Sequence, residues 1–142
     1  MIDTVLGLPL HPLVVHAVVV LLPLMAIITV IVAARPRWRT VAAWPVVAAN
    51  LVVLAFTVLA KESGEHLLRQ MAGLQIDTHV SLGSKLPIFA LLVTLASLLV
   101  AIGRQRKGFT TLAVVVTTLA AVVAVFWTLR TGHSGAESVW GS

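Results

Sequence analysis

Five histidines are the residues of this sequence whose types and positions could do chemistry. They stand beside long apolar segments, at His11, His16, His66, His79 and His133. A neutral imidazole is a common ligand of haem iron, zinc, copper and non-haem iron. Ionisable residues embedded in a membrane are scarce and are usually functional. The histidines therefore predict a bound haem or metal ion, provided that the surrounding elements bring them together.

Four apolar segments supply those elements. We expect membrane helices over about residues 10–34, 41–61, 79–103 and 109–130. Each is close to the roughly 20 residues that cross the hydrocarbon core of a bilayer, and each is apolar on every side. A chain with 59% hydrophobic and 11% charged residues is not an ordinary soluble domain. The predicted fold class is all-α, with residues 1–142 forming one integral membrane domain, an up-and-down four-helix bundle.

The distribution of charge predicts the orientation of this bundle. Six of the ten Lys and Arg residues lie in the links 35–39 and 104–107, which contain no acid. The positive-inside rule makes these links cytoplasmic and both termini extracytoplasmic, in a multi-pass membrane protein. The excess positive charge is thereby explained by arginines in loops at one face of the lipid bilayer, and no nucleic-acid partner is expected. The absence of cysteine excludes disulfides, thiolate metal sites and covalently attached haem.

The four-helix arrangement suggests how the histidines pair. In an up-and-down bundle the first and third helices are diagonal, and so are the second and fourth. His16 would then face His79, and His66 would face His133. Opposed imidazoles are the axial ligands of a low-spin b-type haem, and ligands on facing helices are how bundles hold cofactors. The alternative is that histidines at a membrane surface are simply tolerated there.

Three further residues are candidates near this site. Arg130 could pair with haem propionates or with lipid phosphates. Lys85, expected one to two turns inside the third helix, could reach a propionate or extend to the headgroups. His11 precedes Pro12, which favours extended backbone, so His11 could serve only local hydrogen bonds at the start of the helix.

These residues give one leading function and two alternatives. The leading function is a membrane b-type haem protein for electron transfer at the extracytoplasmic face, working with a redox partner protein or as a homo-oligomer. Any enzymatic role would be that of an electron-transfer component of an oxidoreductase, since no catalytic motif is present. The first alternative binds or delivers Cu, Zn or Fe through Glu62 and the histidines: His16, His79, His66, His133 and His11. The second is a structural or assembly subunit without a cofactor.

Three motifs resemble a known family. The segment 8–16 resembles the start of the bacterial membrane proteins catalogued as domain of unknown function 2231. Residues 63–65 and 79–83 are similar to the middle of that family, and residues 131–141 to its glycine-rich C-terminal motif. The resemblance implies four membrane helices. Some relatives carry the domain beside cytochrome c or Rieske-type modules, so the resemblance also implies electron transfer.

Overall fold

A computed structural model of the protein describes residues 4–5, 8–70, 83–106 and 108–140, with side chains at 13–65, 83–106 and 108–133. This part of the chain contains four helices: α1 (Leu10–Ala34), α2 (Pro36–Gln70), α4 (Leu86–Ile102) and α5 (Phe109–Trp140). A short antiparallel pair of strands, β1 (Thr4–Val5) and β2 (Leu8–Pro9), precedes α1.

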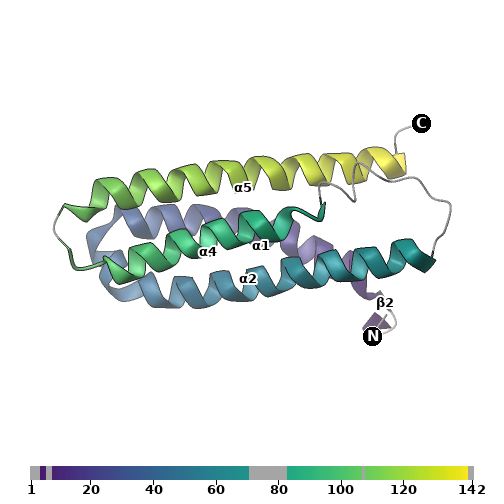
Figure 1. Ribbon diagram of the computed structural model, residues 1–142, viewed down its shortest axis with the longest axis horizontal. Coiled ribbons are helices and arrows are strands. Elements are labelled where there is room, and N and C mark those ends of the chain that lie inside the picture. Colours follow the sequence, from purple (N-terminus) through teal and green to yellow (C-terminus); the bar gives the residue numbers. More distant parts are fainter. Residues whose placement is uncertain (1–3, 6–7, 71–82, 107, 141–142) are drawn as a thin grey trace.

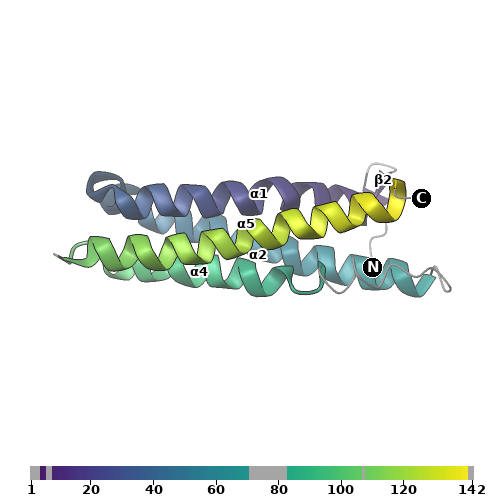
Figure 2. The same ribbon diagram turned by 90° about the horizontal axis from the view of Figure 1, so that it is seen from above.

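The four helices form one elongated bundle (Figures 1 and 2). Helix α1 packs against α2 and α5, and α4 packs against the same two helices from the other side. Helices α1 and α4 are therefore diagonal, as the up-and-down arrangement predicts. The α1–α2 and α4–α5 turns lie together at one end, which we call the basic end. The start of α1 and the end of α5 lie at the opposite end, called here the histidine end.

Prolines and one glycine fix where the helices start. Pro12, Pro36 and Pro87 each stand in the first turn of a helix, where a backbone N–H has no intrahelical partner and its loss costs little. Gly108 has a φ of 78°, a left-handed conformation that residues with a Cβ rarely adopt, and α5 begins at the next residue.

Three helix boundaries differ from the sequence prediction. Helices α2 and α5 continue past residues 61 and 130, to Gln70 and Trp140, because the polar residues that follow the apolar segments are compatible with helix. Helix α4 begins at Leu86, after a turn at Ser84 and Lys85, although the third span was expected from about residue 79. Lys85 was expected inside that helix, and this was wrong because Lys85 is its N-cap residue.

The proline two residues after Lys85 explains that turn. The ring of Pro87 would clash with the carbonyl of residue 83 in a continuous helix, and Pro87 has no N–H with which to bond it. Helix α4 is consequently short, with 17 residues.

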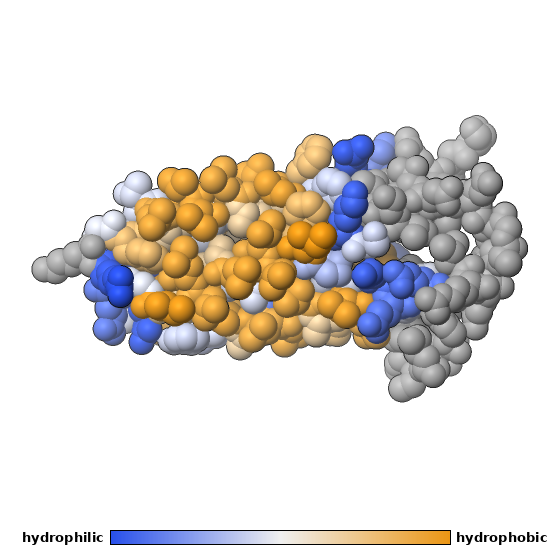
Figure 3. All heavy atoms as spheres, viewed as in Figure 1, coloured by the Kyte–Doolittle hydropathy of each residue, from blue (hydrophilic) through white to orange (hydrophobic). Residues whose placement is uncertain are grey.

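The outside of the bundle is apolar over its middle. Exposed Val, Leu and Ile side chains form a belt, and hydrophilic residues gather at both ends of the described surface (Figure 3). Segments of α1, α2 and α5, of 22, 30 and 25 residues, are long and apolar enough to cross a membrane. Because a water-soluble bundle would bury this belt, the surface is that of a helical membrane protein.

Polar side chains connect three helices in the middle of the interior. The Asn50 side chain of α2 donates to the Thr29 hydroxyl of α1 at 3.0 Å, and Thr29 donates to the Met25 carbonyl at 2.6 Å. The Thr94 hydroxyl of α4 donates to the Ala90 carbonyl at 2.7 Å and lies 3.4 Å from the Asn50 carbonyl. Hydrogen bonds between side chains of different helices are a main source of stability where lipid supplies no hydrophobic driving force.

The Asn50–Thr29 hydrogen bond should be measurable. We expect Asn50→Leu to lower the free energy of unfolding, and a double-mutant cycle with Thr29→Val to give a coupling energy of about 1 kcal/mol. Unfolding by SDS in mixed micelles, followed by circular dichroism, measures both quantities. A coupling energy indistinguishable from zero would show that the two helices do not depend on this bond.

A buried arginine joins three helices at the basic end. Arg39 of α2 is only 4% exposed. Its guanidinium donates to the carbonyl of Ala33, at the end of α1, over 2.9 Å and to the hydroxyl of Thr110, at the start of α5, over 2.8 Å. The Nε atom of Arg39 has no hydrogen-bond partner. Arg39 therefore ties both turns of the basic end together.

Candidate functional site at the histidine end

The structure describes two of the five histidine side chains. His16 lies on α1 and His133 lies on α5, and both are exposed. His11 and His66 lie on α1 and α2, but their side chains are outside the described residues, as is the whole of His79. The predicted pairs His16–His79 and His66–His133 therefore remain predictions.

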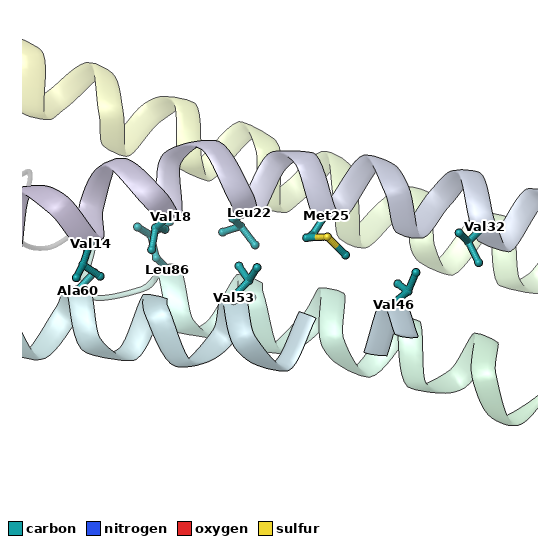
Figure 4. Packing of buried hydrophobic residues seen from close by; sticks show 10 residues of the cluster. Val14, Val18, Leu22, Met25, Val32, Val46, Val53, Ala60 and Leu86 are labelled. Atoms are coloured by element: carbon teal, nitrogen blue, oxygen red, sulfur yellow. The ribbon is translucent and has the colours of Figure 1, made fainter. Parts of the chain in front are cut away.

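The interior at the level of His16 is filled with apolar side chains. Val14 and Val18 of α1 are buried and belong to one cluster with Ala60 of α2 and Leu86 of α4 (Figure 4). His16 is two residues from each of these valines, which places it about 160° around the helix from both. His16 consequently points away from the bundle interior. The sequence interpretation had expected the cofactor in that interior.

The packing of α1 on α5 puts His16 and His133 at the same level. The two helices run in opposite directions, and Ala26 of α1 packs with Ala121 and Ala124 of α5. His16 is ten residues before Ala26, and His133 is nine residues after Ala124. Since both helices rise 1.5 Å per residue, the two histidines lie at nearly the same height along the bundle.

Both histidines point outward from the bundle. His133 follows Trp127 by six residues, which is about 120° around α5, and Trp127 faces α4. His133 is also nine residues after Ala124, about 180° around α5, so His133 points outward and away from the α1 contact. His16 precedes Val30 by fourteen residues, close to four turns, and Val30 packs against the α1–α5 alanine contact. We call His16 and His133 the α1–α5 histidine pair.

A second group at the histidine end surrounds Trp127. The Trp127 ring stacks on Phe89 of α4, with centroids 4.8 Å apart and an angle of 29° between the rings. The Lys85 ammonium lies 5.6 Å from the Trp127 ring centroid, and the Arg130 guanidinium lies 5.9 Å from it. Neither cation forms an ion pair within the described side chains. Two cations on one ring form a site with net positive charge, open to an anionic group.

The sequence interpretation found the two cations but missed what positions them. Lys85 and Arg130 were singled out, whereas Trp127 was not among the candidate site residues. The sequence spacing could have indicated this group, because Phe89 is four residues after Lys85 and Trp127 is three residues before Arg130. Residues three and four apart are neighbours on a helix surface.

The carboxylate proposed for a metal site does not join the histidine pair. Glu62 is exposed and lies two residues after Ala60, which is buried, so the Glu62 carboxylate points away from the interior. Helix α2 continues through Glu62 and His66, so the two are one turn apart, as expected for that spacing. Among the described residues, no group of three His, Asp or Glu side chains is positioned to bind a metal ion.

Fold and surface together define a class of protein, the helical membrane proteins, here with an apolar belt around the four long helices of the described part of the chain. The chain belongs more specifically to the DUF2231 family of predicted membrane proteins, because the family profile matches residues 7–142. The resemblance of the three sequence motifs is thereby confirmed. No curated protein and no solved structure matches the chain.

Proposed function

We propose that this protein is a membrane b-type haem protein that transfers electrons at the extracytoplasmic face, with the α1–α5 histidine pair as iron ligands. The observation that carries the proposal is that His16 and His133 lie at the same level of two adjacent helices and are both exposed. The proposed site is on the outside of the bundle, because Val14 and Val18 fill the interior at that level.

The histidine pair and a neighbouring cation suit the chemistry of a haem. Two neutral imidazoles are the ligands of a low-spin b-type haem, which when bound supplies one-electron transfer. Arg130 precedes His133 by three residues on α5, so its guanidinium is a neighbouring cation for a propionate.

The exposure of the histidine pair has a consequence for partners. A haem held on the outside of a bundle must be covered by lipid, by a second copy of this chain or by another protein. A protein partner that covers the site would also be the electron donor or acceptor. The proposal therefore includes a subunit role in a redox assembly, which agrees with the exposed apolar side chains on α1 and α5.

The proposed orientation places this site outside the cytoplasm of a bacterial inner membrane. Arg35, Arg37, Arg39, Arg104 and Arg106 all lie at the basic end, opposite the histidine pair. Under the positive-inside rule the basic end is cytoplasmic, so both termini and the histidine pair are extracytoplasmic.

An absorption spectrum of the protein purified from haem-supplied cells tests the proposal. We expect a Soret band and a reduced α-band at about one haem per chain, both lost in His16→Ala and in His133→Ala. His66→Ala serves as the matched control and is expected to keep both bands, since this histidine is on α2, which is not adjacent to α5.

Other outcomes of that experiment would contradict the proposal in different ways. Loss of the bands in His79→Ala together with their retention in His133→Ala would restore the diagonal pairing of His16 with His79. A colourless protein with stoichiometric copper, zinc or iron would instead establish a metal-binding or delivery protein. A colourless and metal-free protein would establish a structural or assembly subunit.

A further inference from the structure

The basic end carries a net positive charge that no described side chain neutralises. The residues of both turns contain arginines and no carboxylate, and all five acids of the sequence lie outside residues 4–61 and 78–136. Beneath this surface Arg39 is buried, and its two hydrogen-bond acceptors are a carbonyl and a hydroxyl, neither of them charged. Among the described residues, no carboxylate competes with an external anion for this end.

One stripe of α2 combines charge with apolar surface at this end. Arg37, Val41 and Trp44 are spaced i, i+4 and i+7, which places them on one side of the helix. All three are exposed; Val41 is 77% exposed and Trp44 is 49% exposed. The stripe runs from a cation at the end of the bundle to apolar side chains toward the belt.

A second arginine is held over the same stripe by another helix. Arg104, just after α4, donates to the Ala101 carbonyl at 2.8 Å, and its guanidinium lies 6.0 Å from the Trp44 ring centroid. The carbonyl bond and the ring fix the guanidinium beside α2. Arg37 and Arg104 form no ion pair within the described side chains.

We propose that Arg37, Val41, Trp44 and Arg104 form a binding site for one anionic phospholipid of the leaflet at the basic end. The two guanidiniums bind the phosphate and the anionic headgroup, since guanidinium forms paired hydrogen bonds with phosphate oxygens. Val41 and Trp44 contact the glycerol and the first acyl carbons, because tryptophan favours this depth of the bilayer. A free phosphate ion would use only the guanidiniums, whereas the apolar part of the stripe suits a lipid.

Lipid titration of the full-length protein, followed by native mass spectrometry, tests this site. We expect phosphatidylglycerol to bind about tenfold more tightly than phosphatidylcholine, as two cations near a membrane surface allow. The double variant Arg37→Gln/Arg104→Gln should reduce this preference to less than about threefold. Arg35→Gln/Arg106→Gln removes the same charge from exposed positions of the same two turns, outside the stripe, and should keep the preference.

Three results would overturn the proposal. The wild-type protein could bind the two lipids equally. The control pair could abolish the preference as fully as the stripe variant does, which would show a general effect of charge. Millimolar inorganic phosphate could displace the phosphatidylglycerol, which would show a site for the free ion. The absorption spectrum plays no part in this test, so it is independent of the haem proposal.

Discussion

Replacing Arg39 by alanine is expected to lower the free energy of unfolding by about 3 kcal/mol, the scale of breaking hydrogen bonds made by a charged group. The substitution leaves the Ala33 carbonyl and the Thr110 hydroxyl without their guanidinium donor and opens a cavity among α1, α2 and α5. Part of this loss is offset, because the buried charge and the unpartnered Nε also disappear. We expect the broken bonds and the cavity to outweigh that gain.

Two other substitutions separate these contributions. Arg37→Ala removes an exposed guanidinium two residues away and should change stability by less than about 0.5 kcal/mol. Arg39→Met fills the space without the charge. It should lower the free energy of unfolding by about half as much as Arg39→Ala does. SDS titration in mixed micelles provides the unfolding free energies. Equal stability of the wild-type protein and Arg39→Ala would refute the role of Arg39 as a tie between the two turns.

Replacing Ala124 by leucine should destabilise the protein by about 3 kcal/mol, the upper part of the range for overpacking a core. Ala124 is fully buried and packs with Ala26 and Ala121, so α1 and α5 approach each other through small side chains. Three added carbons have no free volume at this contact and would push the two helices apart. Since the same contact sets the register of His16 and His133, the haem bands should also be lost.

Ala55→Leu is the matched control for this prediction. It makes the same chemical change on α2, where Ala55 is exposed, and should leave both the stability and the spectrum almost unchanged. Stability is again measured by SDS titration, and haem content by the absorption spectrum. A destabilised Ala124→Leu protein that keeps its haem bands would show that the α1–α5 contact does not position the two histidines. Retention of full stability would contradict close packing at Ala124.

Local sequence signals predicted the helices and the arrangement of the bundle well. Apolar segments of membrane length marked four helices, and the family profile over residues 7–142 supports a membrane protein. The signals were weaker at the helix ends. The turn at Lys85 depends on Pro87, and the extension of α2 to Gln70 depends on polar residues that the apolar pattern does not cover.

The candidate site was predicted less completely than the fold. Lys85 and Arg130 were identified from their charge, and the structure brings both to the Trp127 ring. His16 and His133 were each identified, but they were assigned different partners across the interior. The pairing assumed that a ligand on a bundle helix faces inward, whereas both side chains are exposed.

The sequence by itself determined that this is a helical membrane protein with an arginine-rich pair of turns at one end and His16 and His133 toward the other. Segment length, composition and charge suffice for that, because each is a property of the chain and not of its packing. Only the tertiary structure decided which side of each helix faces inward. Helices that are apolar on every side carry no stripe that marks the interior, so the close fit of Val14, Val18, Ala26 and Ala124 made that choice. That packing turned His16 and His133 to the outside.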